Sequence, residues 1–490
     1  MNIKKILNVD YDLEITGINI DSRLVKPGDL FVCIKGYTVD GHQFAKKAEA
    51  AGAVAIVCEH LIDDVQIPQI VVESTQIELP RLAHMAFNQP TEKLNLYGVT
   101  GTNGKTTVAY MMEHLFKSFS SHTAYIGTNG IRYADYEIEP INTTPEPLSL
   151  QKTFADMVIE NVENVAIEVS SHALDLCRVD YCAFKVAVFT NLTPEHLEFH
   201  PTMEDYFQAK YKLFTQIVPN GYAIINIDDE YGVRIVELLK EKDVNVLTYA
   251  VEKEADFQAQ DIQMTISGTK FTLKSPKGDF EVHAPILGLF NVYNVLATMA
   301  AMYTSEMPLE KMIESIQHLP GVDGRMELIN EGQDFTVIVD FAHTPDGVEK
   351  VLEFVSSIKQ NKIRFLIGCP GDRDRTKRPV MARLAVDYAD DAIFTTDDPH
   401  SEDPVAILDE MVAELADEQY EVIVDRADAI EAVINRAQAN DIVVIAGRGH
   451  EKLQYWKDYN IVLDDREVAK EVLRKKLSDI KKQIQYAPEA

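Results

Sequence analysis

Short runs of apolar residues, separated by stretches with helical spacing, recur along almost the whole chain of 490 residues. Runs rich in Val, Ile, Ala and Phe are typical of buried parallel strands that helices cover on both faces. The pattern predicts strands at residues 54–58, 68–72, 96–100, 164–170, 186–192, 222–228, 335–341, 363–369, 391–396 and 441–447. The sequence therefore predicts an α/β fold.

Helices are expected between these strands, with clear amphipathic examples at 107–116, 378–390 and 403–418. A chain of this length exceeds one ordinary hydrophobic core, so several domains are expected. The polar stretch NQPTEK indicates a linker, and PGVDGRMELI opens a further set of strands. We therefore expect domains at 1–92, 93–322 and 323–490.

The charge balance narrows the choice of partners. The chain has 47 basic and 78 acidic residues, a net charge of −31. A surface this negative repels nucleic acids and anionic lipids, so we expect no nucleic-acid partner. None of the 5 cysteines has CxxC spacing, and the chain shows neither a signal peptide nor an apolar run of membrane-spanning length. We expect a soluble, cytoplasmic monomer without integral membrane contact.

The stretch GVTGTNGKTT at 98–107 follows an apolar strand and precedes a helix. Such a strand–turn–helix directs backbone N–H groups and a helix N-terminus at one point, which suits a phosphate. Gly101 and Gly104 permit the turn, Lys105 can reach the β- and γ-phosphates, and the Thr106 hydroxyl can bind Mg²⁺. An ordinary glycine-rich turn is the alternative, but Gly-Lys-Thr at this place favours a nucleotide site.

Several further polar residues are ambiguous by themselves. Glu168 ends a predicted strand and could hold Mg²⁺ or simply face solvent. His196 and His200 have zinc-like spacing without an HExxH pattern, and Lys210 alone is typical of an exposed helix lysine. Asn291 and Asn294 lie in an apolar helical pattern, where their amides should bond each other or face a ligand.

The phosphate loop resembles that of the Mur ligases, the ATP-dependent amino-acid ligases of peptidoglycan precursor synthesis. Ordered matches run from residue 21 to residue 466. The resemblance implies a three-domain α/β architecture with an N-terminal domain for the UDP-substrate, a central P-loop ATPase domain and a C-terminal Rossmann-like domain for the amino acid. It is strongest to ligases that add a diamino acid to UDP-N-acetylmuramoyl-L-alanyl-D-glutamate through an acyl phosphate.

The resemblance implies ATP, Mg²⁺ and CO₂ as cofactors. ATP contacts are expected from Gly101, Thr102, Asn103, Gly104, Lys105, Thr106, Thr107, Asn291, Arg325 and Asp340. Metal ligands are expected to be Thr106, Glu168, His196 and Lys210. The last would be an N6-carboxylysine, since CO₂ turns its amine into an anionic carbamate that can bind Mg²⁺. Lys105, His196, Lys210 and Arg325 are the expected catalytic residues, while His200 is expected to pack or cap.

The resemblance also implies two sets of substrate residues. The UDP-N-acetylmuramoyl-dipeptide would contact Ser22, Asn142, Thr143, Thr144, Ser170 and Arg178, although Ser22 could instead be a helix N-cap. The amino acid would contact Arg373, Arg378, Asp397, Asp398, Pro399, His400, Gly447 and Glu451. The basic loop around Arg373 and Arg378 interrupts an acidic chain, which favours a substrate carboxylate over a solvated loop balancing nearby acids.

The identity of the diamino acid depends on Asp397-Asp398-Pro399-His400. Family members that add meso-diaminopimelate typically have Asp-Asn-Pro-Arg there, and the arginine pairs with a carboxylate that lysine lacks. A mostly neutral histidine offers no such fork. The motif therefore favours L-lysine, with meso-diaminopimelate as the alternative because Arg378 and the GRGHE run resemble enzymes for that substrate. L-Ornithine stays open.

Two other functions compete with this reading. One is a ligase similar to folylpolyglutamate synthetase, against which the segments DSR and DDPHSEDP argue. The other is a regulatory ATPase without ligase activity, in which His196, Lys210 and the basic loop would have no purpose.

Overall fold

The computed structural model describes residues 2–7, 12–36, 39–120, 122–139, 141–197, 199–415 and 420–485. The chain divides into two compact units. The first unit contains Met1–Leu192, Met203–Phe257 and Ala297–Leu309, and the second contains Thr193–Thr202, Gln258–Leu296 and Glu310–Ala490. The domain boundaries expected near residues 92 and 322 stay predictions.

The first unit begins with a small parallel sheet in the order β1-β2-β3-β4, which confirms the strands expected at 54–58 and 68–72. Its elements are α1 (Ile3–Leu7), β1 (Ile18–Asn19), β2 (Leu30–Val32), η1 (Gly41–Phe44), α2 (Ala45–Ala50), β3 (Ala55–Cys58), β4 (Gln69–Val71), α3 (Thr75–Ala86) and η2 (Pro90–Lys93). Successive residues of β2 and β3 enter two separate apolar clusters, because side chains alternate between the faces of a strand.

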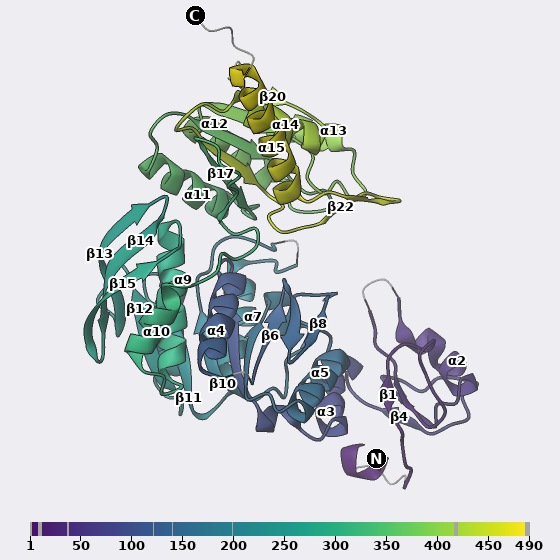
Figure 1. Ribbon diagram of the computed structural model, residues 1–490. Coiled ribbons are helices and arrows are strands. Elements are labelled where there is room, and N and C mark those ends of the chain that lie inside the picture. Colours follow the sequence, from purple (N-terminus) through teal and green to yellow (C-terminus); the bar gives the residue numbers. More distant parts are fainter. Residues whose placement is uncertain are drawn as a thin grey trace, which may run out of the picture. The chain divides into compact units, whose positions relative to one another are not determined.

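The part of the larger sheet that belongs to the first unit has the order β12-β11-β10-β5-β9-β6-β7-β8, and Figure 1 labels several of these strands. Its strands are β5 (Asn95–Thr100), β6 (Thr123–Gly127), β7 (Gly130–Tyr133), β8 (Tyr136–Ile138), β9 (Asn164–Glu168), β10 (Phe184–Phe189), β11 (Ile217–Asn226) and β12 (Asn245–Ala250). All are parallel except β7 and β8 at one edge. The central strands are buried along nearly their whole length, as apolar runs predict.

Helices cover both faces of this sheet. They are α4 (Lys105–Phe119), α5 (Pro147–Ile159), α6 (Ser171–Asp175), α7 (Met203–Thr215) and α8 (Glu230–Leu239). Helix α4 packs on β5, β6 and β9, while apolar residues of α5, α7 and α8 join the cluster on the other face. Helix α9 (Leu289–Tyr303) has residues in both units.

The second unit contains a six-stranded sheet in the order β16-β17-β21-β18-β19-β20, parallel except for β16. Its elements are α10 (Leu309–Ile316), β16 (Glu327–Leu328), β17 (Thr336–Asp340), α11 (Pro345–Ser357), β18 (Ile363–Ile367), α12 (Lys377–Tyr388), β19 (Asp391–Phe394), α13 (Pro404–Val412), β20 (Tyr420–Val422), α14 (Arg426–Arg436), β21 (Ile442–Ala446) and α15 (Asp465–Gln485). Helices α11, α12 and α13 cover one face, and α14 and α15 cover the other.

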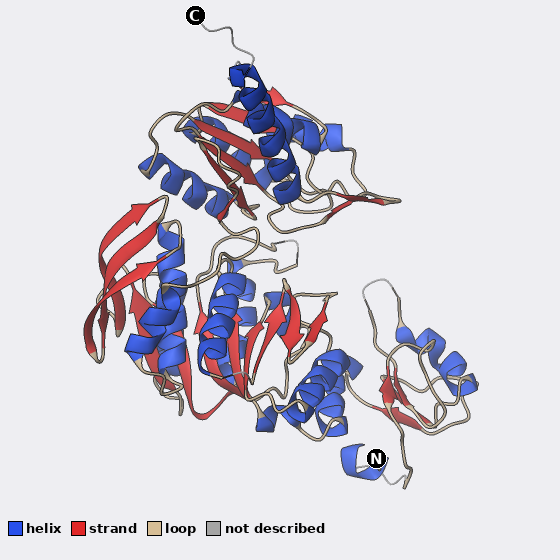
Figure 2. Ribbon diagram, in the orientation of Figure 1, coloured by secondary structure: helices blue, strands red, loops and turns tan. Residues whose placement is uncertain are grey.

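Two further antiparallel parts of the second unit were not expected from the sequence. They are β13 (Phe257–Thr265), β14 (Gly268–Ser275) and β15 (Gly278–Ala284), shown as long arrows in Figure 2, and the hairpin β22 (Leu453–Tyr455) with β23 (Asn460–Val462). Their polar and apolar residues alternate because one face of each strand stays in solvent. A search for continuous apolar runs therefore passes over them.

Strand register brings the functional loops to one edge of the larger sheet. Val99 of β5 lies beside Glu168 of β9, and Thr100 lies beside Phe189 of β10. The carboxyl ends of parallel strands meet at one edge, where ligands of such sheets bind. Every helix in the described ranges is too short or too polar to cross a bilayer.

A buried ion pair ties the start of α14 to the start of α15. The guanidinium of Arg426 donates to both carboxylate oxygens of Asp465 at 2.8 and 2.7 Å, and both side chains are fully buried. Removing one partner would leave an uncompensated buried charge.

We expect Asp465→Ala to lower the free energy of unfolding of the second unit by about 3–5 kcal/mol. The chain has 1 tryptophan, Trp456, so urea unfolding followed by its fluorescence reports on this unit. The control is Glu331→Ala, which breaks an ion pair with the exposed Arg474 and should cost less than about 1 kcal/mol. Equal losses in the two variants would contradict the role of the buried pair.

Candidate functional site

The predicted phosphate loop connects β5 to α4, as expected. Gly101 and Gly104 have φ angles of 150° and 87°, in the region that favours glycine. The backbone N–H groups of Thr102 and Asn103 donate to the backbone and side-chain oxygens of Asn191, both at 2.9 Å. The Thr190 hydroxyl donates to the Asn103 carbonyl at 2.6 Å. The end of β10 thus holds the loop in shape.

Two lysines converge on this loop. Lys105 Nζ donates to the carbonyl oxygens of Gly101 and Thr102 at 2.9 and 2.7 Å, and Lys210 Nζ donates to the same Gly101 oxygen at 2.8 Å. Lys210 is 1% exposed, and its ammonium lies 4.5 Å from the centre of the Tyr206 ring. Positive charge and the first turn of α4 therefore meet at one place, an arrangement that suits a polyanionic phosphate chain.

Two of the predicted metal ligands are in contact. The Thr106 hydroxyl donates to Glu168 Oε2 at 2.8 Å, and the Glu168 side chain has no exposed surface. Glu168 Oε1 accepts from the Tyr125 hydroxyl at 2.6 Å and from the Thr128 N–H at 2.9 Å. Burial and the neighbouring Glu168 charge raise the pKa of Tyr125 well above its ordinary value, so the phenol stays protonated. A buried hydroxyl and carboxylate supply the oxygen ligands that Mg²⁺ prefers.

Most residues expected at the UDP-substrate lie beside this edge. The Thr144 hydroxyl donates to the Glu168 carbonyl at 2.9 Å and accepts from the Ser170 N–H at 3.2 Å. Arg178 donates to the Thr144 carbonyl and pairs with Glu146, at 3.1 and 2.7 Å. The Thr143 and Thr128 hydroxyls are 3.2 Å apart. The Ser170 side chain also caps α6.

Ser22 and Asn142 have less constrained surroundings. Ser22 is buried in a turn between β1 and β2, so the alternative that it caps a helix is wrong. Asn142 is half-buried in the turn that leads to Thr143. Both stay predictions as substrate contacts.

The remaining predicted nucleotide and metal residues belong to the second unit. Nε2 of His196 lies 3.6 Å from Glu195 Oε2, and Nε2 of His343 lies 3.4 Å from the other oxygen of Glu195. His200 packs edge-on against Phe199 and is 3% exposed, as expected of a packing residue. Asn294 donates to the Asn291 side chain at 2.9 Å, so these amides do bond each other.

Asp340 and Arg325 lie near each other at the end of β17. The Asp340 carboxylate accepts backbone N–H groups from Met326 and Ala342, both at 2.7 Å. Burial raises the pKa of Asp340, and the charge of Arg325 opposes that shift. The Arg325 guanidinium lies 4.2 Å from the centre of the Phe341 ring.

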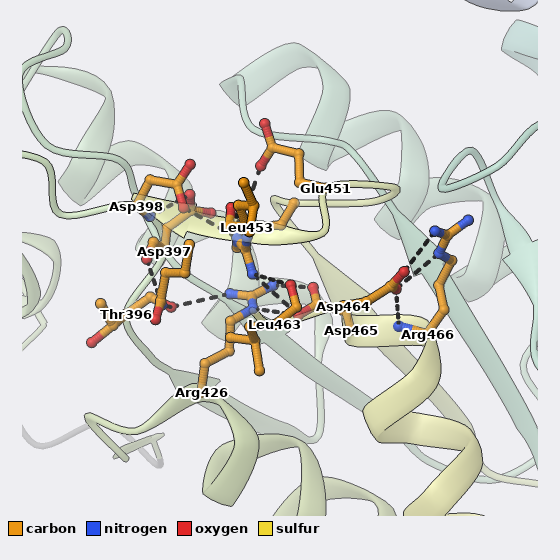
Figure 3. A network of polar contacts seen from close by, with 12 residues as sticks. Thr396, Asp397, Asp398, Arg426, Glu451, Leu453, Leu463, Asp464, Asp465 and Arg466 are labelled. Carbon is orange, nitrogen blue, oxygen red and sulfur yellow. Dashed lines mark hydrogen bonds and ion pairs between the residues drawn. The ribbon is translucent and has the colours of Figure 1, made fainter. Parts of the chain in front are cut away.

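Three carboxylates gather at the carboxyl end of the second unit's sheet (Figure 3). Oxygens of Asp397, Asp398 and Glu451 all lie within 4.8 Å of one another. We call these three residues the acidic pocket. Asp397 Oδ2 is buried and has no hydrogen-bond partner among the described residues. A Cβ on Gly447 would lie 2.6 Å from that oxygen, so glycine is needed there.

A buried arginine partly balances the acidic pocket. Arg448 Nε lies 3.3 Å from Asp398 and 3.8 Å from Glu451, and Arg448 Nη1 lies 3.8 Å from Asp465. Burial, together with the charges of Asp397 and Asp398, still raises the pKa of Glu451 to about 8. Burial and Asp397 raise the pKa of Asp398 to about 6. A cationic ammonium would relieve this surplus of negative charge.

The basic loop is largely neutralised by acids of the same unit. Arg378 is fully buried and pairs with Glu402 and Glu410, at 2.9 and 2.7 Å, and Arg375 also pairs with Glu410. The acids that balance these arginines are therefore Glu402 and Glu410, and not the adjacent Asp372 and Asp374 that the solvated-loop alternative named. Arg373 is exposed and donates to the Asp372 carbonyl at 3.2 Å.

His400 lies beside this loop. Burial and the charge of Arg373 lower the pKa of His400, so its ring is neutral at pH 7, as the sequence indicates. The His400 ring stacks on the ring of Tyr455 in β22, and the backbone N–H of His400 donates to the Tyr455 carbonyl at 3.0 Å.

Several residues that shape these sites were not predicted. Tyr125 lies on β6 and Thr128 directly follows it, and this strand was not among those expected from the sequence. Thr190 and Asn191 were expected to lie within a strand, but they follow the end of β10. Arg426, Arg448 and Asp465 are charged residues that only tertiary structure brings together. A polar residue directly after a buried parallel strand is the signal that could have identified Thr128 and Thr190.

Family comparison covers most of the chain. The descriptions that match are "Mur ligase family, catalytic domain" at residues 14–86, "Mur ligase middle domain" at 99–302 and "Mur ligase, glutamate ligase domain" at 324–449. The chain is 48% identical to a UDP-N-acetylmuramoyl-L-alanyl-D-glutamate–2,6-diaminopimelate ligase of Bacillus cereus, over 95% of each chain. It is 44% identical to the ligase of that name from Listeria monocytogenes, also over 95% of each.

Solved structures agree with these matches. A ligase of the same name is similar with a TM-score of 0.72 and 31% identity, over 97% of this chain and 99% of that one. The MurF ligase of Thermotoga maritima, solved with ADP, has a TM-score of 0.65 at 20% identity, over 96% and 99% of the two chains. The second likeness concerns the fold alone.

The phosphate loop generates a direct prediction. A Cβ on residue 101 would lie 1.8 Å from Thr190 Oγ1 and 3.1 Å from the Asn191 backbone. We expect Gly101→Ala to weaken binding of ADP by at least about tenfold, because the added strain of about 1–3 kcal/mol would displace the loop. Isothermal titration calorimetry measures this. Gly321→Ala, where a Cβ meets nothing within 4 Å, is the control and should bind as the wild type. Unchanged binding by both variants would contradict the role of the loop.

The acidic pocket predicts a pH dependence of stability. With its pKa raised to about 8 from 4.5, folded Glu451 keeps a proton that the unfolded chain has released. Stability therefore falls as pH rises from about 4.5 to about 8, and Glu451→Gln should remove this part of the fall. Because 32% of the side chain remains exposed, we expect a relative gain of about 1–2 kcal/mol for the variant between pH 5 and pH 9. Urea unfolding followed by Trp456 fluorescence at the two pH values checks this, and a pH-independent difference would contradict it.

Proposed function

Because this chain belongs to the Mur ligase family of ATP-dependent peptide ligases, we propose that it joins a diamino acid to UDP-N-acetylmuramoyl-L-alanyl-D-glutamate. It would thus be a UDP-N-acetylmuramoyl-tripeptide synthetase. The observation that carries the proposal is the contact of Thr106 with Glu168 beside a phosphate loop that holds two lysines. Relatives that align over nearly the whole chain support the choice of acceptor.

ATP would bind at the loop from Gly101 to Thr107. The first turn of α4 offers N–H groups that have no acceptor within the helix, and Lys105 can turn from the Gly101 carbonyl to a phosphate oxygen. Thr106 and Glu168 would hold Mg²⁺, which neutralises charge on the phosphates and polarises them when bound. Asn291, Arg325, Asp340 and His196 are proposed as further nucleotide or metal contacts.

Lys210 is proposed to act as an N6-carboxylysine. In the described form its ammonium is buried beside the second lysine and donates to the Gly101 carbonyl. A lysine amine in its neutral form can add CO₂. The resulting carbamate would be an anion with two oxygen ligands, suited to a divalent cation.

The reaction would proceed in two steps. The γ-carboxylate of the D-glutamyl residue attacks the γ-phosphate of ATP, which gives an acyl phosphate and ADP. The α-amine of the diamino acid then attacks the acyl carbon, and phosphate leaves. The chain's contribution is to position the reactants and to exclude water from the acyl phosphate.

The UDP-substrate would lie against the edge formed by Thr143, Thr144, Ser170 and Arg178, where Arg178 is a charged donor for a carboxylate or a phosphate. Ser22 and Asn142 are proposed as outer contacts. Residues 1–92, 93–322 and 323–490 would correspond to the domains for the UDP-substrate, ATP and the amino acid.

The relatives named as 2,6-diaminopimelate ligases favour meso-diaminopimelate as the amino acid. His400 alone suggests L-lysine instead. Both candidates carry a distal ammonium for the acidic pocket, within reach of Gly447. Diaminopimelate adds a carboxylate, for which the exposed Arg373 is the proposed partner because His400 is neutral. Arg378, held by two glutamates, would support the loop, and Asp398, Pro399 and His400 would shape the pocket wall.

The proposal predicts that phosphate release from ATP requires both the UDP-dipeptide and an added amino acid. We expect kcat/KM for meso-diaminopimelate to exceed that for L-lysine by at least about tenfold, the worth of one more ion pair. Coupled phosphate assays with meso-diaminopimelate, L-lysine and L-ornithine measure this. A rate of phosphate release that does not depend on any added amino acid would contradict the ligase proposal. Faster turnover of L-lysine would overturn only the choice of diamino acid.

A further inference from the structure

The two oxygens of Glu168 have different surroundings. Oε1 accepts the Tyr125 O–H at 2.6 Å and the Thr128 N–H at 2.9 Å. Oε2 accepts the hydroxyls of Thr106 and Thr128 at 2.8 and 3.2 Å. A threonine hydroxyl can rotate its proton away and offer a lone pair, whereas a backbone N–H cannot. The side chain is therefore anchored through Oε1, and Oε2 is the oxygen free to face a cation together with Thr106.

The Tyr125 ring is itself held in place. The guanidinium of Arg132, on β7, lies 4.2 Å from the centre of the ring. Arg132 is fixed by Glu113 at 3.2 and 2.5 Å and by the Asn129 carbonyl at 2.9 Å. Glu113 is 3% exposed and lies two turns after Thr106 on α4. Helix α4 thus carries Thr106 directly and supports Glu168 through Arg132 and Tyr125.

A glycine makes this arrangement possible. A Cβ on Gly127 would lie 2.1 Å from Glu168 Oε1 and 2.4 Å from the Tyr125 hydroxyl. Since the strand passes so close to the carboxylate, the tyrosine and the carboxylate have little room to move apart.

We propose that Tyr125 is a positioning residue that fixes the Glu168 carboxylate so that Oε2 and the Thr106 hydroxyl form one edge of the cation site. The inference rests on the proposed function, because the cation is the Mg²⁺ that accompanies ATP. If Tyr125 only filled the core, phenylalanine could replace it without loss. Only the positioning role needs the hydroxyl, so removing the hydroxyl distinguishes positioning from packing.

Tyr125→Phe tests the proposal, with Tyr97→Phe as the matched control. Tyr97 lies on β5 of the same sheet, is fully buried and packs against Phe116 of α4. Binding of a non-hydrolysable ATP analogue is measured by calorimetry without metal and over a series of MgCl₂ concentrations. We expect Tyr125→Phe to raise the MgCl₂ concentration for half-maximal effect by about three- to tenfold and to leave the metal-free affinity within about twofold. Tyr97→Phe should change neither quantity.

Coupling to Glu168 gives a second test. In the Glu168→Gln background, Tyr125→Phe should have almost no further effect on the MgCl₂ midpoint, because the carboxylate that it positions is gone. Arg132→Met keeps the hydroxyl but frees the ring, and should shift the midpoint by about two- to threefold. It serves as the informative variant if Tyr125→Phe does not fold.

The outcomes separate the two proposals. A wild-type chain that binds no analogue, or binds it without any dependence on MgCl₂, overturns the ATP site itself. A normal wild-type dependence with an unchanged midpoint in Tyr125→Phe overturns only the positioning role. Equal shifts with and without the Glu168 carboxylate would also overturn it, since Tyr125 would then act through another group.

Discussion

A negative charge buried at the carboxyl end of β9 is the constraint on which the middle of this chain depends. The Glu168 side chain is fully buried, and an ionised carboxylate in that position costs several kcal/mol unless donors surround it. Those donors come from the end of β6, from the turn after it and from the start of α4. The strand register, the glycine at 127 and the first turn of α4 all serve to bring them there. The same contacts leave one carboxylate oxygen beside Thr106, where a phosphate-bound cation would be needed.

The acidic pocket in the second unit also places negative charge in a buried position, but it is stabilised differently. Three carboxylates share a small volume there, and Arg448 and Arg426 stand behind them with Asp465 between. The two arginines balance only part of the negative charge of the pocket. Burial and the remaining charge therefore raise the pKa values of Glu451 and Asp398. Glu168 is anchored through Oε1 and can turn Oε2 to a metal, whereas the three carboxylates of the acidic pocket keep a surplus of negative charge that suits an ammonium. In both places the charge balance of the folded chain indicates the sign of the ligand.

The sequence was sufficient for the parts in which local pattern determines structure. The apolar runs at 164–170 and 441–447 are buried parallel strands, and the glycines at 101 and 104 do adopt the backbone angles of a phosphate loop. It was insufficient where tertiary contacts decide. The half-exposed strands β13, β14 and β15 have no continuous apolar run, and the pairing of Arg378 with Glu402 and Glu410 joins residues more than twenty positions apart. Tyr125 could not be distinguished from an ordinary core aromatic, because nothing in its neighbourhood shows that its hydroxyl reaches Glu168. The identity of the diamino acid illustrates the same limit, since His400 alone favours L-lysine while whole-chain relatives favour diaminopimelate.

The central claim is that the loop before α4 holds the phosphates of ATP while Thr106 and Glu168 hold their cation. A crystal structure of the chain with a non-hydrolysable ATP analogue and Mg²⁺ tests it most directly. The account predicts phosphate oxygens against the loop from Gly101 to Thr107, and a metal at about 2.1 Å from Thr106 Oγ1 with Glu168 Oε2 facing it directly or through one water. An analogue bound elsewhere, with this loop empty and Glu168 turned away from the metal, would contradict the account.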